Sequence, residues 1–153
     1  MTIRQAESRD VEALIRLRLD FLQDEGVALT AEEAADIAAR FRQYLQTAMP
    51  GGGFIAIIAE EEGAAVSTAF ASLAERPARK AFVPCTVGMP HNVFTYPAYR
   101  RRGIATRVVN ALTDAARQAG AGCMDLLATE AGVPLYAKLG FRKINMQPMR
   151  RDL

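Results

Sequence analysis

Residues 99–107 read YRRRGIATR: three consecutive arginines run into a glycine at the point where a helical pattern begins. The preceding residues 92–96 are predicted to form a strand that Pro97 ends. From residue 105 to residue 119 apolar side chains recur at helical spacing, and Gly120 fits the end of that helix. A helix N-terminus carries unpaired N–H groups and partial positive charge, which disfavours cations unless an anion binds there. The stretch therefore predicts an anion site between a strand and a helix.

The expected anion is a phosphate ester. Gly103 allows positive φ and a close approach of the backbone to a ligand, and Ala105 leaves the helix start unobstructed. Each arginine of the triplet can pair with phosphate oxygens through two donors. The GxxxxGK[ST] and GxGxxG patterns of other nucleotide sites are both absent from the sequence. A solvated basic turn remains the alternative interpretation of the triplet.

Composition narrows the class of protein. The chain has 153 residues, enough for a single domain (1–153) with its own core, and the shares of hydrophobic (50%) and charged (24%) residues are ordinary for such a domain. A formal net charge of +2 is too small to indicate a nucleic-acid-binding protein. Two cysteines and one histidine exclude a disulfide scaffold and a Cys/His zinc site, so we expect no metal. Because no apolar run reaches membrane-spanning length and the N-terminus lacks a signal-peptide core, we expect a cytoplasmic protein.

The remaining elements are predicted from periodicity and helix caps. The second helix opens with Thr30-Ala-Glu-Glu33, a capping box in which the hydroxyl and the carboxylate each take an unpaired N–H. Residues 75–90 hold three prolines and little periodicity, which predicts a long loop. The other predicted elements are strands at 2–5, 54–59, 65–73, 124–128 and within 141–149, a first helix after Ser8 or Asp10, and a short helix at 133–139. This order indicates a mixed α/β (α+β) fold in which helices cover a largely antiparallel sheet.

Two motifs together resemble the GNAT superfamily of acyl-CoA-dependent N-acetyltransferases. The family's glycine-loop pattern is Arg or Gln, two residues, Gly, one residue, then Gly or Ala, and Arg100, Gly103 and Ala105 match it. A later motif, a Leu-Tyr pair followed shortly by Leu-Gly-Phe, is met by residues 135–136 and 139–141. The pairing of the two motifs at this distance is far more specific than either motif alone.

The resemblance is close over residues 91–143 and implies a sheet of six to seven strands, about four helices and a splayed central pair of strands. It also implies acetyl-CoA as co-substrate, with its pyrophosphate on the N–H groups of residues 101–106. The strand at 93–95 would splay from its neighbour after Cys123, and pantetheine would lie in the gap. The coenzyme-binding residues implied are Val93, Phe94, Thr95, Arg100, Arg101, Arg102, Gly103, Ile104, Ala105 and Thr106.

For the reaction, the resemblance implies that a primary amine of a small molecule or peptide attacks the thioester directly. Tyr136 would be the general acid, because its unperturbed pKa of about 10 is close to that of the departing thiol. The backbone N–H of Val93 or Phe94 would stabilise the oxyanion. Glu130 is the residue assigned as general base, and His91 or a chain of waters are the alternatives.

The sequence does not identify the amine that accepts the acetyl group. Asp24 and Glu25, between the first two helices, would hold a cationic amine, whereas Arg76, Arg79 and Lys80 would suit an anionic one. Many relatives place an asparagine that contacts coenzyme A at the position where this chain has a threonine, residue 129. The sequence does not determine the oligomeric state. Dimers are common among relatives, so a homodimer is one alternative.

Two other functions compete with the enzyme. A catalytically silent coenzyme A-binding module for regulation or interaction would bind the coenzyme tightly and turn over no amine. A nucleic-acid binder would use the arginine triplet and the basic C-terminus, but the chain lacks interleaved aromatic residues and an overall basic balance. We therefore expect an acetyltransferase with an amine acceptor, no membrane segment and no nucleic-acid partner.

Overall fold

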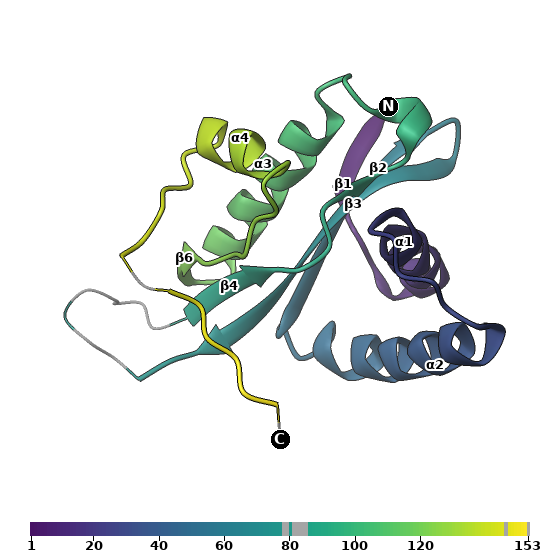
Figure 1. Ribbon diagram of the computed structural model, residues 1–153, viewed down its shortest axis with the longest axis horizontal. Helices are drawn as coiled ribbons and strands as arrows, with labels where there is room; N and C mark the ends of the chain where they lie inside the picture. Colours follow the sequence, from purple (N-terminus) through teal and green to yellow (C-terminus); the bar gives the residue numbers. More distant parts are fainter. Residues whose placement is uncertain (78–79, 81–85, 146, 153) are drawn as a thin grey trace.

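The structure is a computed structural model that describes residues 1–77, 80, 86–145 and 147–152. Its strands are β1 (Thr2–Gln5), β2 (Phe54–Glu61), β3 (Ala64–Glu75), β4 (Thr86–Pro90), β5 (Phe94–Thr95) and β6 (Ala121–Met124), and its helices are α1 (Val11–Asp24), α2 (Ala31–Ala48), α3 (Ile104–Gln118) and α4 (Val133–Lys138). The helices α3 and α4 lie on one side of the sheet and α1 and α2 on the other (Figure 1). The predicted mixed α/β fold with about four helices is confirmed.

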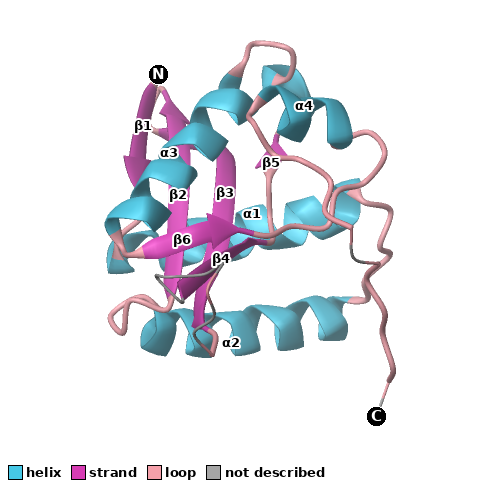
Figure 2. Ribbon diagram, turned by 90° about the vertical axis from the view of Figure 1, so that its left-hand side faces the viewer, coloured by secondary structure: helices cyan, strands magenta, loops and turns pink. Residues whose placement is uncertain are grey.

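The sheet has the order β1-β2-β3-β4-β6, and β5 pairs with β3 beyond the end of β4. All of these pairs are antiparallel except β4 with β6, which is parallel. Figure 2 shows β6 beside β4 at the end of the sheet. In β2 the residues 54–59 are all buried, because helices cover this central strand on both faces.

The first face of the sheet is covered by α3, as its apolar stripe predicted. Val108 and Leu112 are fully buried against Ile55 and Ile57 of β2 in one core cluster. Gly120 follows the helix with a φ of +89°, the left-handed conformation expected of a glycine that ends a helix.

On the second face, α1 and α2 pack on β2 and β3 through Leu14, Leu45 and Phe70, all with no more than 2% of their surface exposed. The predicted capping box at the start of α2 is present. Thr30 Oγ1 accepts from the N–H of Glu33 at 3.2 Å, and the Glu33 carboxylate accepts from the N–H of Thr30 at 2.8 Å. Side chains at the start of this helix therefore accept hydrogen bonds from N–H groups that have no partner within the helix.

The prediction of one long loop over residues 75–90 is wrong. β3 continues to Glu75, and β4 occupies Thr86–Pro90, hydrogen-bonded to β3 on one side and to β6 on the other. Pro90 is the last residue of β4, where a missing N–H costs little of the ladder, so the proline did not prevent a strand. Arg79 and the other residues at 78–79 and 81–85 lie outside the described residues.

The predicted strand at 92–96 is shorter and is preceded by a bulge. The N–H of His91 donates to Phe70 O at 3.0 Å, and Phe94 then lies opposite Thr68. Three steps along this segment therefore match two steps along β3, which leaves one extra residue at 92–93. The bulge separates β4 from β5.

Two further boundaries differ at the C-terminal end. The strand predicted at 124–128 is β6, Ala121–Met124, and ends where the prediction began. The strands predicted within 141–149 are absent from the described residues of that segment. Its apolar residues do not alternate, and Ile144 and Met149 are 51% and 95% exposed, so no buried face selects a strand there.

Candidate active site

The N-terminus of α3 is an open array of backbone donors. Gly103 precedes the helix with a φ of +71°, and the first backbone bond across the helix start runs from Arg107 N–H to Gly103 O at 3.2 Å. The N–H groups of residues 101–106 have no acceptor in the described part of the chain. The start of α2, by contrast, is closed by its own side chains. Six consecutive free donors at a helix start are the geometry that binds phosphate, so this end of α3 fits the pyrophosphate of a coenzyme.

The arginine triplet divides into two roles in the structure. Arg100 donates to Thr95 O at 2.9 Å and to the Asp24 carboxylate at 2.6 Å, and Arg102 forms two bonds of 2.8 and 3.0 Å with Glu61. Arg101 has a φ of +62° and makes no hydrogen bond or ion pair with the described residues. Arg100 and Arg102 therefore brace the glycine loop against the rest of the protein, and Arg101 keeps its donors free for an anion.

The strands β4 and β6 run parallel and then diverge. They are paired only up to Gly88 and Met124, and the last bond runs from Asp125 N–H to Gly88 O at 2.9 Å. Beyond this point β6 leads into a loop and β4 into the bulge. The resemblance implied a divergence after Cys123 but assigned it to the strand at 93–95. In the structure the strand that pairs with β6 is β4, and residues 93–95 follow it beyond the bulge.

The bulge leaves the N–H of Val93 without an acceptor among the described residues. Phe94 lies opposite Thr68 and Tyr96 N–H donates to Val66 O at 3.1 Å, so the backbone of these two residues is directed at β3. Backbone groups alternate in direction along a strand, so those of Val93 point away from β3 toward the gap. The N–H of Val93 has no acceptor in the described residues, which makes it, rather than that of Phe94, the donor available to a carbonyl oxygen in the gap.

Tyr136 lies on α4 with its ring half-buried. The ring packs edge-on against Phe141 at 5.6 Å between centroids, and its hydroxyl has no partner in the described part of the chain. Burial raises the pKa of Tyr136, so the hydroxyl stays protonated at neutral pH. Thr129 accepts from Gly132 N–H at 3.2 Å and so shapes the turn that leads into α4.

The two candidate bases lie in different surroundings. Glu130 is exposed in the turn before α4 and has no ion-pair partner among the described residues. His91 lies directly before the bulge, where Nε2 is 2.7 Å from Ser72 Oγ. Partial burial and the charge of Arg18 lower the pKa of His91, so its ring is neutral and able to accept a proton at pH 7.

Comparison with known proteins decides the family. Residues 52–143 match the family model described as acetyltransferase (GNAT) domain. The chain belongs to the GNAT acetyltransferase family. It is therefore an acyltransferase. No curated protein sequence gave a significant match.

Solved structures resemble the GNAT chain over nearly its whole length. A predicted acetyltransferase from Clostridium acetobutylicum, determined with acetyl-CoA, has a TM-score of 0.87 and 25% identity, covering 98% of this chain and 95% of that chain. A GCN5-related N-acetyltransferase from Ralstonia eutropha has a TM-score of 0.81 and 24% identity, with 98% and 97% covered. An acetyltransferase from Trypanosoma brucei has a TM-score of 0.66 and 26% identity, with 99% of each chain covered.

Two residues of this GNAT site were missed in the sequence. Asn92 is fully buried in the bulge, and its Oδ1 accepts from Arg18 Nη1 at 3.0 Å. Arg18 stands four residues after Leu14 and three before Phe21, on the apolar stripe of α1. A cation on the buried face of an amphipathic helix was the available signal, since such a position normally carries an apolar side chain.

Two of the acceptor residues considered from the sequence are paired within the protein. Asp24 is bound by Arg100, and Arg76 donates to the Asp125 carboxylate at 3.0 Å. Glu25 and Lys80 are exposed. Among the described residues of the two sets, none therefore presents a free, sheltered charge to an acceptor.

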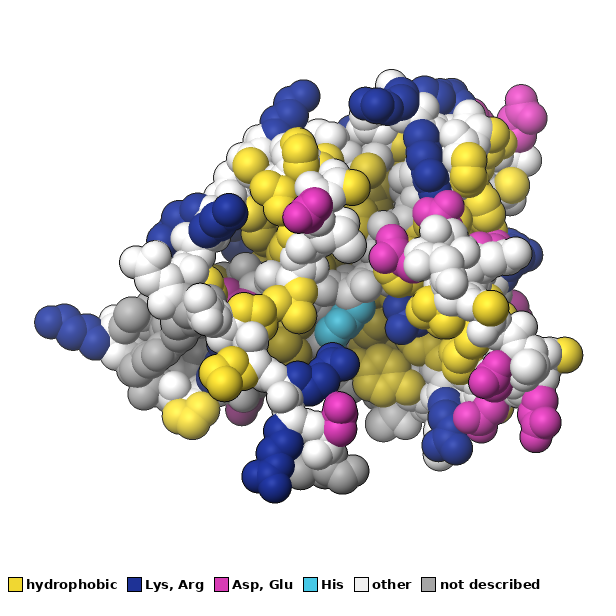
Figure 3. All heavy atoms as spheres, in the orientation of Figure 1, with side chains coloured by type: hydrophobic (Ala, Val, Ile, Leu, Met, Phe, Trp, Pro, Cys, Tyr) yellow, Lys and Arg dark blue, Asp and Glu magenta, His cyan; other side chains and the backbone are white. Residues whose placement is uncertain are grey.

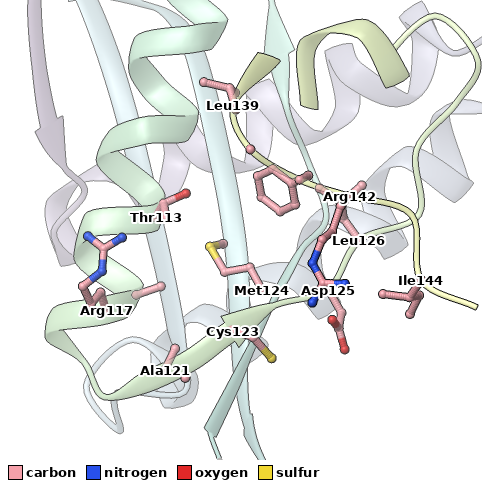
Figure 4. A pocket seen from close by; sticks show the side chains of 14 residues that line it. Thr113, Arg117, Ala121, Cys123, Met124, Asp125, Leu126, Leu139, Arg142 and Ile144 are labelled. Atoms are coloured by element: carbon pink, nitrogen blue, oxygen red, sulfur yellow. The ribbon is translucent and has the colours of Figure 1, made fainter. Parts of the chain in front are cut away.

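A cavity of the GNAT domain lies away from the α3 N-terminus. It measures about 400 Å³ and is bounded by the C-terminal half of α3, the strand β6 and the segment after α4 (Figure 4). Its lining includes Thr113, Arg117, Cys123, Met124 and Phe141.

No group of three His, Cys, Asp or Glu residues within the described ranges could hold a metal. No helix within these ranges is long and apolar enough to cross a membrane.

Proposed function

We propose that this GNAT acetyltransferase transfers the acetyl group of acetyl-CoA to a primary amine of a small molecule or peptide. The observation that carries the proposal is the row of six unpaired N–H groups at residues 101–106, with the free guanidinium of Arg101 beside it. A dipole and donors of this kind select a phosphate-bearing ligand. The relative from Clostridium acetobutylicum, 25% identical, was determined with acetyl-CoA.

The residues of the chain divide the chemical work. Acetyl-CoA supplies an activated thioester when bound. The N–H of Val93, unpaired at the mouth of the splayed strands, donates to the carbonyl oxygen on which negative charge develops. Tyr136 donates its hydroxyl proton toward the departing sulfur, a role suited to a hydroxyl that is protonated and has no other partner. Holding the amine and the thioester together supplies much of the remaining rate gain.

The amine must lose a proton before it attacks. Glu130 was the residue assigned to this step from the sequence, and its exposed carboxylate is one route for the proton. His91 is the second route, and its neutral ring, fixed by Ser72, supports that role. Water can carry the proton from the amine to either side chain, and this route needs no further residue.

The first test is thermal unfolding of the protein with acetyl-CoA, with ATP and NAD as controls. A ligand at one hundred times its dissociation constant adds about 2.7 kcal/mol of stability, which is a shift of a few degrees. A shift specific to acetyl-CoA, followed by thiol release with a panel of amines, would support the proposal. Equal shifts with ATP would reduce the site to a general anion site, and binding without turnover of any amine would indicate the silent coenzyme A-binding module instead.

A further inference from the structure

Arg18 differs from the other arginines of the described residues. Each of the others either pairs with a carboxylate or is exposed to solvent. Arg18 is half-buried and has no carboxylate within ion-pair distance in the described part of the chain. Its guanidinium lies 5.6 Å from the ring centroid of Phe21 and donates one hydrogen bond, to Asn92.

The hydrogen-bonding capacity of Arg18 is mostly unused. A guanidinium has five N–H donors, and among the described residues only Nη1 has a protein acceptor. Burial lowers the pKa of Arg18, which is the cost of sheltering a charge without a counter-charge. Arginine nevertheless stays charged in proteins, so the site holds a permanent cation with free, forked donors.

The position of Arg18 relates it to the reaction. Its acceptor Asn92 is the residue between His91 and Val93, and it is fully buried in the bulge at the splayed strands. The residue that accepts the hydrogen bond of Arg18 is therefore the chain neighbour of Val93, whose free N–H is proposed to bind the acetyl carbonyl. In Figure 3 the single histidine of the chain, His91, lies in a hollow of the surface, and an Arg or Lys side chain lies beside it.

We propose that Arg18 binds a carboxylate on the amine acceptor, so that the substrate is an amino acid or another amine with a free carboxylate. This inference rests on the proposed function. The planar fork of a guanidinium matches two carboxylate oxygens, and the guanidinium of Arg18 lies over the aromatic ring of Phe21. A cationic acceptor is disfavoured because Arg18 would repel it and Asp24 is occupied by Arg100.

The test compares L-amino acids with their carboxamides, which keep the amine and the side chain and lose the negative charge. Initial rates of thiol release with acetyl-CoA are measured for the wild type, Arg18→Gln, Arg18→Lys and the charge-matched control Arg40→Gln, whose side chain is 78% exposed on α2. Calorimetric binding of the same amines to protein saturated with coenzyme A gives a second readout that needs no turnover. Acetyl-CoA binding, followed by thermal shift, checks that each variant is folded.

We expect the wild type to favour one or more acids over their amides in kcat/KM, and Arg18→Gln to lose about tenfold or more of that preference. Arg18→Lys should retain part of it, because the charge remains and the fork is lost, and Arg40→Gln should retain all of it. The inference is overturned if no acid is preferred in turnover or binding, or if Arg18→Gln weakens acids and amides equally. If acids bind in an Arg18-dependent way but no acetyl group is transferred, the proposed function is contradicted and the carboxylate site is supported.

Discussion

The ring of Tyr136 packs directly over Gly132: a Cβ at Gly132 would lie 3.1 Å from Cε2 of the tyrosine. Gly132 has a φ of −82°, so its backbone conformation is open to any residue, and only the missing side chain makes room for the ring. The turn before α4 thus fixes where the tyrosine hydroxyl lies.

We expect Gly132→Ala to lower turnover while the protein remains folded, because the new methyl group displaces the Tyr136 ring by a few tenths of an ångström. The measurement is kcat for amine acetylation together with the acetyl-CoA-induced thermal shift. Gly53→Ala is the matched control, since a Cβ there meets only Ala48 O at 3.9 Å. Equal kcat values for the two variants would show that the ring position does not matter for the reaction.

Tyr136→Phe should reduce kcat by about tenfold or more and leave acetyl-CoA binding nearly unchanged, because the hydroxyl acts as the sulfur departs. Because burial raises the pKa of Tyr136 above its usual value, the wild type should not lose activity through this group below about pH 10. Tyr44→Phe, on the partly exposed face of α2, controls for the loss of a tyrosine hydroxyl. A Tyr136→Phe enzyme with wild-type turnover would make the tyrosine a packing residue only.

Gly103→Val should abolish the stabilisation of the protein by acetyl-CoA. At a φ of +71° a valine is strained by about 1–2 kcal/mol, and its side chain stands in the open space before the free N–H groups. Gly120→Val carries the same kind of strain at the other end of α3, where the φ is +89° and space is also open. If both variants keep, or both lose, the acetyl-CoA shift, the assignment of the phosphate site to residues 101–106 fails.

His91 should titrate below its usual pKa of 6.5, because partial burial and the charge of Arg18 both disfavour the imidazolium. Arg18→Gln removes the charge, so the pKa of His91 should rise in that variant. Since the chain has one histidine, its ring proton signal can be followed by NMR across pH without assignment. Arg40→Gln should leave the titration in place, and an unmoved pKa in Arg18→Gln would contradict the contact between α1 and the bulge.

Asp10→Asn should destabilise the fold by about 1–3 kcal/mol. The Asp10 carboxylate accepts from Arg4 at 2.7 and 2.8 Å and from Glu7 N–H at 2.8 Å, and the bonds from Arg4 chiefly lower its pKa. A carboxyl whose folded pKa lies below its unfolded value of 3.8 stabilises the fold above that pH, and this contribution is lost as the pH falls through the folded pKa. Denaturant unfolding at pH 7 and below pH 4 should therefore show a smaller pH effect in the variant, whereas Asp36→Asn, from an exposed pair, should change stability little.

The local parts of this protein were readable from its sequence. Apolar spacing placed α3, the capping box placed the start of α2, and Gly103 with Ala105 placed the open helix start, because each of these depends on residues within one or two turns of each other. The resemblance carried by residues 91–143 added the splayed strands and Tyr136. The unpaired N–H groups at 101–106 followed from the same short stretch.

The tertiary structure decided what joins distant segments. It gave Arg100 and Arg102 carboxylate partners 76 and 41 residues away, and it brought Arg18 to Asn92, 74 residues away. It also made a strand of Thr86–Pro90, because hydrogen bonds to β3 and β6 on both sides outweigh a weak local preference. Ion pairs and strand pairing depend on which segments meet in space, and no periodicity in one segment encodes its partner in another.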